Sequence, residues 1–210
     1  MSTVYEAAAL LPDPAELRVH LRALAVLDAA IGDDPQFRQY TFDADWGPGQ
    51  EVSLMNSGSG DDFSVHFTPA GVLIRGFDHE SAMSPYGTDD EEVWPGVIDQ
   101  VPAALRPLLD DPAFHDEGID APRVTVCLWR ETGGTAWRTG SAIDFPAGDG
   151  DPDGSGFLFH LLTDRSPEAV QAHFEDYYER PVPLDAVRHA LAGRPVTPAI
   201  AAALNPAGVK

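Results

Sequence analysis

Two alternating runs joined by a short turn constrain the fold of this chain more than any other feature. Residues 62–68 alternate apolar and polar side chains, and residues 72–77 follow a Thr-Pro-Ala-Gly turn at 68–71. A period of two is the spacing of a β-strand, and the turn residues predict that the second run folds back on the first. We therefore predict an antiparallel hairpin with one buried face, which carries Phe63, Val65 and Phe67.

The polar side of this hairpin carries two residues with binding chemistry, His66 and Arg75. In one register Arg75 comes near His66 across the hairpin, whereas a slip of one residue turns its side chain to the other face. If Ser64, His66, Arg75 and Asp78 converge, this face is a polar binding surface. The alternative is a half-exposed histidine covered by the C-terminal helices.

Three adjacent ionisable residues, Asp78, His79 and Glu80, follow the hairpin. If the strand continues, its period places Asp78 and Glu80 on one face and His79 on the other. Paired carboxylates can hold a divalent cation, or one acid can donate a proton while the other stays ionised. His115 lies in a second cluster of the same residue types, so Asp78, Glu80 and His115 are the candidate metal ligands. The spacing matches no metalloenzyme signature such as H-E-x-x-H, and a solvated or structural strand end is the alternative.

Several later residues are further candidates for contacting a ligand or partner. Ser84 and Tyr86 follow the acidic triplet, and Trp94 lies beside a Gly/Pro turn, where a ring can anchor a partner. Tyr177 and Tyr178 are adjacent on a predicted helix, so at most one of them can face the protein core fully. The other is a candidate for contacting a partner. No G-x-S-x-G elbow accompanies the serines. The sequence contains no recognisable catalytic signature, which favours a binding protein over an enzyme.

The rest of the chain predicts a single α+β domain over residues 1–210. Asp13 and Pro14 signal the start of an amphipathic helix that ends at Gly32. We expect an antiparallel sheet of about five to six strands with this N-terminal helix and the C-terminal helices packed on one face. The predicted parts are a helix and β-meander over 1–80, an irregular Pro-rich segment over 81–122, strands over 123–145 and a helical part over 157–205.

A net charge of −21 excludes some classes of partner. Such a field repels nucleic acids and anionic membranes, and it favours a cation or a basic protein surface. The alternative is that the acidity serves solubility or reflects codon composition, since Lys210 is the only lysine. Cys127 is the only cysteine, so no internal disulfide can form.

The first eleven residues show no basic segment ahead of an apolar run, so no signal peptide is expected. The apolar stretches are shorter than the roughly 20 residues that a membrane-spanning helix needs. These two features predict a cytoplasmic protein that does not engage a membrane.

One pattern resembles a known group of sequences. The segment G-F-D-H-E-S-x-M-S-P-Y at 76–86 is followed by W-P-G at 94–96, C-L-W-R-E-T-G at 127–133 and D-Y-Y-E at 176–179. This pattern resembles a group of uncharacterised bacterial proteins along most of the chain. The resemblance implies a bacterial, stand-alone domain, and it transfers no activity and no functional residue.

Three hypotheses of function follow from the sequence. The leading one is an acidic cytosolic protein that engages a basic partner, as immunity proteins and antitoxins do. The second is a metal-assisted hydrolase or lyase built on Asp78, His79 and Glu80, with a divalent metal as its only cofactor. The third is a small-ligand binding domain whose pocket lies between the sheet and residues 81–122.

Overall fold

The computed structural model describes residues 2–87, 91–112, 121–148 and 150–206. Its residue contacts divide the chain into two compact units. The first unit comprises residues 1–11 and 43–160, and the second comprises residues 12–42 and 161–210.

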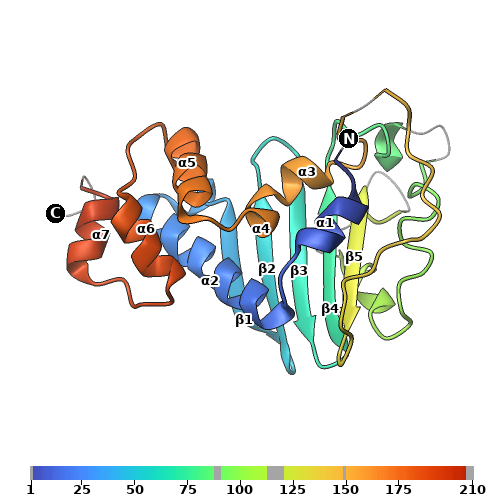
Figure 1. The fold of residues 1–210 in the computed structure, drawn as a ribbon, viewed down its shortest axis with the longest axis horizontal. Helices are drawn as coiled ribbons and strands as arrows, with labels where there is room; N and C mark the ends of the chain where they lie inside the picture. Colours follow the sequence, from blue (N-terminus) through green and yellow to red (C-terminus); the bar gives the residue numbers. More distant parts are fainter. Residues whose placement is uncertain (1, 88–90, 113–120, 149, 207–210) are drawn as a thin grey trace. The chain divides into compact units, whose positions relative to one another are not determined.

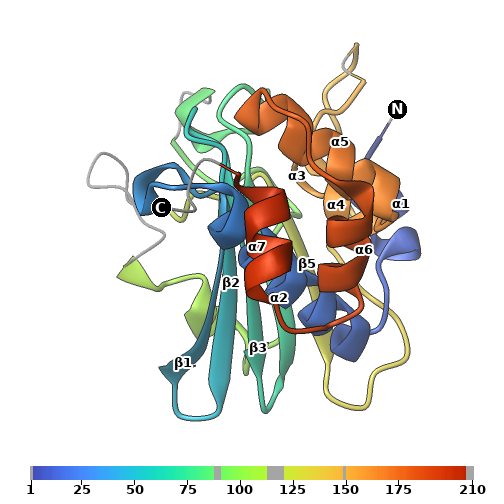
Figure 2. The same ribbon diagram turned by 90° about the vertical axis from the view of Figure 1, so that its left-hand side faces the viewer.

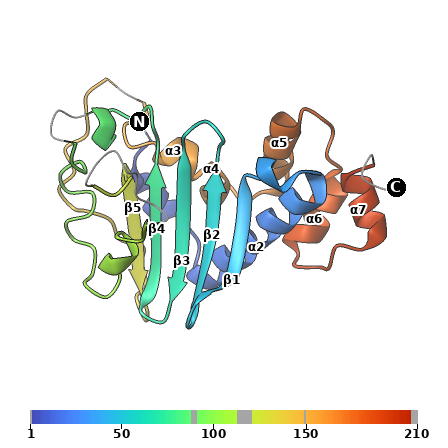
Figure 3. The ribbon, with the colours of Figure 1, turned by 180° about the vertical axis from the view of Figure 1, so that it is seen from behind.

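A five-stranded antiparallel sheet confirms the predicted α+β class (Figure 3). The strands lie side by side in the order in which they occur along the chain. They are β1 (Tyr40–Gly47), β2 (Gln50–Asn56), β3 (Asp62–Thr68), β4 (Gly71–Phe77) and β5 (Val126–Glu131).

The β3–β4 hairpin turns where the sequence predicts. Thr68 pairs with Gly71, and this register places Ser64 directly opposite Arg75. Ser64, His66 and Arg75 therefore share one face of the sheet, as one of the two predicted registers requires. The prediction of a single buried face is wrong, because His66 on the polar side is only 1% exposed.

Two short helices of the first unit cover one face of the sheet (Figure 1). Helix α1 (Val4–Leu10) contacts β5, and α3 (Ser155–Leu158) contacts β4. Phe159, which follows α3, packs its ring edge-on against Phe63 with the ring centroids 5.8 Å apart. Helix α1 was not predicted from the sequence.

Two acidic side chains just before α3, those of Asp151 and Asp153, hold the starts of α1 and α3 in place. Asp153 accepts a hydrogen bond from the Val4 amide at the start of α1 (2.8 Å) and another from the Ser155 amide (2.9 Å). Asp151 accepts hydrogen bonds from the amides of Gly156 and Phe157. These carboxylates satisfy helix N-termini, whose first amides lack partners within the helix.

The opposite face of the sheet is covered by the irregular segment that follows β4. Part of the predicted irregular segment forms the short 3-10 turn η3 (Arg106–Leu108). Within the strands predicted over 123–145, the part that follows β5 contributes one bridge, between Arg138 and Trp129. A packed apolar cluster nevertheless forms here from Leu73, Met83, Val97, Val101, Leu105, Leu109, Val124, Cys127 and Trp129.

The second unit is helical (Figure 2). Helix α2 contacts α5, α6 and α7, and α6 also contacts α5 and α7. The side chains of Ser166 and Thr197 cap α5 and α7, whereas the Asp13 side chain makes no capping hydrogen bond to α2. The helices are α2 (Pro14–Ile31), α5 (Pro167–Tyr178), α6 (Leu184–Leu191) and α7 (Pro198–Leu204), with η1 (Pro35–Phe37) after α2 and α4 (His160–Thr163) before α5.

A buried carboxylate, Asp28, joins three segments of this unit. It accepts a hydrogen bond from the Tyr40 amide (2.6 Å) and another from the Tyr178 hydroxyl. Burial raises the pKa of Asp28, although the hydrogen bonds from Tyr178 and Tyr40 oppose that rise. Gly32 permits this arrangement, since a Cβ there would lie 2.5 Å from the Tyr178 hydroxyl oxygen.

None of the helices in the described ranges combines the length and the apolar character that crossing a bilayer requires.

Gly76 gives a test of the packing between the sheet and α3. A Cβ at this position would lie 2.7 Å from Val126 Cγ1 and 2.9 Å from Leu158 Cδ1. We expect Gly76→Ala to lower the free energy of unfolding by about 1–3 kcal/mol because it overpacks the core. Gly87→Ala is the matched control, since nothing lies within 4 Å of a Cβ built there. Equal denaturant midpoints for the two variants would contradict the described packing.

Candidate functional site

The open end of the β3–β4 hairpin brings together Asp61, Asp78 and His79. The register pairs Asp62 with Phe77, so one further step places Asp61 opposite Asp78. One potential ligand atom from each of the three residues lies within 4.8 Å of the others. We refer to these three residues as the hairpin-end cluster.

Asp61 is the buried centre of this cluster. Its Oδ1 lies 2.6 Å from His79 Nδ1 and accepts a hydrogen bond from the His79 amide (3.1 Å), while Oδ2 accepts one from Ser57 Oγ (3.0 Å). Burial alone would raise the pKa of Asp61, but the hydrogen bonds from His79 and Ser57 outweigh it and lower the pKa. The same contact with Asp61 raises the pKa of His79 and favours its protonated form.

Asp78 sits against a glycine that leaves room for it. The side chain of Asp78 occupies the space where a Cβ on Gly154 would lie, and Gly154 has a positive φ of 73°. Asp78 Oδ1 accepts a hydrogen bond from the Glu80 amide (2.9 Å). Burial raises the pKa of Asp78, and the nearby negative charge of Asp61 raises it further. Two close carboxylates, one of which has a raised pKa, form a site suited to holding a proton or a cation.

The predicted partners of Asp78 differ from the observed ones. The strand ends at Phe77, so the expected alternation of Asp78, His79 and Glu80 across a continuing strand is wrong. The Glu80 side chain is 85% exposed, and its Oε1 lies 3.9 Å from His79 Nε2. His115 lies outside the described residues. Asp61 occupies the place that was expected for Glu80.

A second polar group, which is buried, lies on the sheet face next to this cluster. Arg75 is 2% exposed and forms an ion pair with Asp62. It also donates to the Arg123 carbonyl (2.5 Å) and to Ser64 Oγ (3.4 Å), and Ser64 Oγ lies 3.2 Å from His66 Nε2. Arg123 donates to the other oxygen of Asp62 (2.8 Å).

This buried network only partly matches the predicted polar surface. Ser64, His66 and Arg75 do converge, but Asp62 rather than Asp78 is their carboxylate, and His66 is buried rather than half-exposed. Burial lowers the pKa of Arg75, although the charge of Asp62 opposes that change. A buried ion pair held by two arginines and backbone carbonyls has a structural role in orienting this sheet face.

The remaining candidates each have structural contacts of their own. Ser84 is 1% exposed, and its Oγ accepts a hydrogen bond from the Tyr86 amide (3.4 Å). The ring of Tyr86 packs edge-on against Phe77 and is 47% exposed. Trp94 packs against the apolar cluster that includes Leu73 and Trp129, and it donates a hydrogen bond to the Asp144 carbonyl (3.0 Å). Of these three residues, Tyr86 offers the largest surface to a partner.

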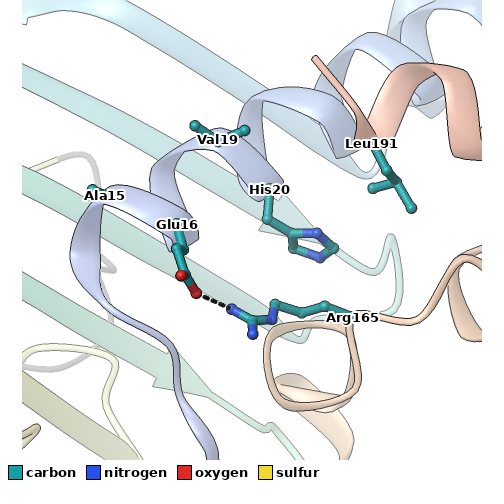
Figure 4. A pocket seen from close by; sticks show the side chains of 6 residues that line it. All are labelled: Ala15, Glu16, Val19, His20, Arg165 and Leu191. Carbon is teal, nitrogen blue, oxygen red and sulfur yellow. Dashed lines mark ion pairs between the residues drawn. The ribbon is translucent and has the colours of Figure 1, made fainter. Parts of the chain in front are cut away.

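An open pocket of about 550 Å³ lies in the second unit, and Figure 4 shows the side chains that line it. His20 and Arg165 line it beside the apolar Val19 and Leu191, and Arg165 lies 3.6 Å from Glu16 in an ion pair. His20 Nε2 lies 2.8 Å from the Leu161 carbonyl oxygen, and burial lowers the pKa of His20 to about 4. The pocket therefore presents a neutral imidazole and a balanced ion pair, so it selects no particular charge.

A second opening in the same unit has a different character. It is a groove of about 420 Å³, which we call the acidic-aromatic groove. Three carboxylates and three aromatic rings surround it. Its lining residues are Gly32, Asp33, Asp34, Phe37, Tyr177, Tyr178 and Glu179.

Sequence reasoning missed Asp61 and Asp62 as members of these sites. The signal was present in the predicted turn, because pairing residues 68 and 71 fixes every later pair on the two strands. Extending that register by one pair beyond the strand ends places residue 61 opposite residue 78. The acidic-aromatic groove carries no comparable signal, since its two halves lie far apart in the sequence.

The chain matches no family model, no curated protein and no solved structure. Its function must therefore be inferred from its own residues.

The buried His66 predicts a loss of stability in acid. Burial, followed by the nearby charge of Arg75, lowers its pKa from 6.5 to about 4, with Asp111 opposing. Between these two pH values the unfolded chain binds more protons than the native chain, so stability falls as the pH falls through this window. We expect His66 to account for about 3 kcal/mol of that loss.

The measurement is the free energy of unfolding of the wild type and of His66→Gln across this pH range. Asp28, Asp78 and Asp153 have raised pKa values and act in the opposite direction. Both proteins contain these groups, so the difference between the two curves isolates His66. Parallel curves would show that His66 is solvated in the native state.

Proposed function

We propose that this chain is an acidic binding protein that engages a basic protein partner. The observation that supports the proposal is how its cationic side chains are used. Within the part of the chain that the structure describes, five of the twelve arginines donate hydrogen bonds to the chain's own backbone carbonyls. They are Arg75, Arg106, Arg123, Arg130 and Arg180.

The sequence itself supplies too few cations to balance its acidic side chains. The sequence has 34 aspartates and glutamates against 13 lysines and arginines. One carboxylate, Asp62, takes two of the arginines for itself. The remaining negative field speeds encounter with a positive surface and makes the association sensitive to salt.

The packing of the irregular segment bears on the third hypothesis of function. The face of the sheet where a small-ligand pocket was expected carries the apolar cluster around Leu73 and Trp129 in the described residues. The small-ligand hypothesis therefore gains no support from this face. A binding surface on the outside of the molecule needs no such cavity.

A second candidate function, divalent-cation binding, is favoured by the hairpin-end cluster. Two carboxylates and an imidazole within 4.8 Å of one another are a suitable ligand set for a divalent ion. A bound ion would compete with the proton that contact with Asp61 favours on His79. A water molecule on such an ion is the nucleophile that a metal-assisted hydrolase would use.

The leading proposal predicts a salt-sensitive basic partner. The immobilised chain is incubated with an extract of its source cells. We expect it to retain at least one basic protein at about 0.05 M ionic strength and to release that protein at about 0.5 M. An unrelated acidic protein of similar size and charge is the control bait. The proposal fails if both baits retain the same proteins or if the retained proteins are not basic.

Divalent-cation binding predicts a thermal shift that depends on specific residues. Saturating Mn²⁺, Zn²⁺ or Ca²⁺ should raise the melting temperature, since an ion at a hundred times its Kd stabilises the native state by about 2.7 kcal/mol. Asp78→Asn keeps the acceptor for the Glu80 amide but removes the charge, so it should abolish the shift. Glu80→Gln removes the same charge from an exposed neighbour and should leave the shift intact.

The pH dependence of that shift is a further check. Because contact with Asp61 raises the pKa of His79, an ion must displace a proton at low pH, and its binding should strengthen as the pH rises through that pKa. If the divalent ion raises the melting temperatures of Asp78→Asn and Glu80→Gln equally, the hairpin-end cluster is not its binding site and this second candidate function fails.

A further inference from the structure

We propose that the acidic-aromatic groove of the second unit is where the basic partner docks, and that it receives an arginine side chain of that partner. The inference rests on the proposed function, which it narrows to one surface and one kind of side chain.

The groove forms where two segments distant in the sequence meet. Asp33, Asp34 and Phe37 come from the turn that follows α2, and Tyr177 and Glu179 come from the end of α5. The Tyr177 hydroxyl donates to the Phe37 carbonyl (2.7 Å) and ties the two sides together. The groove is therefore held open by contacts within its own walls.

The rings of the groove are held in place without closing it. The Tyr178 hydroxyl points inward to the buried Asp28, and the rings of Tyr177 and Tyr178 meet edge-to-face with their centroids 4.9 Å apart. Phe37, by contrast, is 65% exposed. An exposed phenylalanine beside two fixed tyrosines gives a flat cation a ring face on which to stack.

The carboxylates of the groove keep capacity to accept hydrogen bonds. Asp33 Oδ1 accepts from Asn205 Nδ2 (2.5 Å), and Asp34 Oδ1 accepts from the Gln36 amide (2.9 Å). Each of these aspartates has a second oxygen, and Glu179 is exposed at the end of α5. Three carboxylates on one groove favour a cationic occupant.

One arginine of the chain itself, Arg180, is held beside the groove. Arg180 donates to the Ile31 carbonyl and to Asn205 Oδ1 (3.3 Å), and its guanidinium lies 5.6 Å from the centroid of the Tyr178 ring. This contact shows that a guanidinium already stacks on an aromatic ring of the groove. It leaves Asp34, Glu179 and the exposed ring of Phe37 for a second one.

Arginine fits this lining better than lysine. A guanidinium is planar, stacks on aromatic rings and forms paired hydrogen bonds to a carboxylate, whereas an ammonium group is a compact, strongly hydrated charge. A surface that offered carboxylates alone would not distinguish the two. The aromatic part of the groove therefore makes the choice of cation a measurable property.

Fluorescent hexa-arginine, hexa-lysine and hexa-glutamine peptides are the probes, with Kd measured by anisotropy on the full chain. We expect hexa-arginine to bind more tightly than hexa-lysine. Asp34→Asn, which keeps an acceptor for the Gln36 amide, combined with Glu179→Gln should weaken hexa-arginine binding by about tenfold. Phe37→Ala should weaken it by about threefold and reduce the preference for arginine.

Matched variants elsewhere serve as controls. Glu80→Gln combined with Glu92→Gln removes the same charge from exposed positions of the first unit, and Phe157→Ala truncates another ring that is 52% exposed. We expect changes of less than about twofold for both, since distant exposed charges are screened. Melting temperatures and circular dichroism spectra verify that every variant is folded.

The outcomes separate the two proposals. If hexa-arginine binds but the groove and control variants weaken it equally, the docking site is wrong while the binding of basic partners stands. Equal affinities for hexa-arginine and hexa-lysine would likewise overturn the assignment of an arginine. If hexa-arginine binds no better than hexa-glutamine at low salt, both the groove and the proposed function fail.

Discussion

The register of the β3–β4 hairpin is the constraint on which the rest of the first unit depends. Pairing Thr68 with Gly71 sets Ser64 opposite Arg75, and it brings Asp62 within reach of the same guanidinium. A shift of one residue would move Arg75 to the other face, where Phe63 and Ile74 pack, and would leave a buried charge without its partner. The ion pair and the apolar pattern therefore select the same register. That register also creates the hairpin-end cluster, because it sets Asp61 against Asp78.

The features that could be predicted are those with local signals. Helices α5 and α7 each begin with a capping serine or threonine followed by proline, which is a start signal that the sequence alone displays. Helix α1 was missed because its capping carboxylate, Asp153, lies far away in the sequence. The burial of His66 could not be read from alternation, since the segment that covers its face is irregular and has no period of its own. Asp61 could have been found by carrying the predicted register outward, whereas the acidic-aromatic groove depends on the meeting of α5 with the turn after α2.

Arginine and carboxylate have different roles in this chain. Five of the arginines in the described residues donate to backbone carbonyls, as Arg106 does to those of Ile98 and Asp99. Some carboxylates also have structural duties, such as Asp28 in the second unit and Asp153 at α1. Others, such as Asp33, Asp34 and Glu179, are exposed. Several of the few cations of the chain therefore hold irregular backbone in place, while the negative charge of the protein comes from the excess of acidic over basic residues.

Glu179 ends α5 in the left-handed region of backbone conformation, with φ 49° and ψ 38°. Glycine adopts this conformation without steric strain and is the common residue at such helix ends. Glycine at this position would relieve the strain and remove one carboxylate from the groove, so the two effects oppose each other. Selection for stability alone would favour glycine or asparagine, whereas selection for charge would retain glutamate. The residue that relatives of this chain carry at position 179 therefore indicates whether selection there has favoured stability or negative charge.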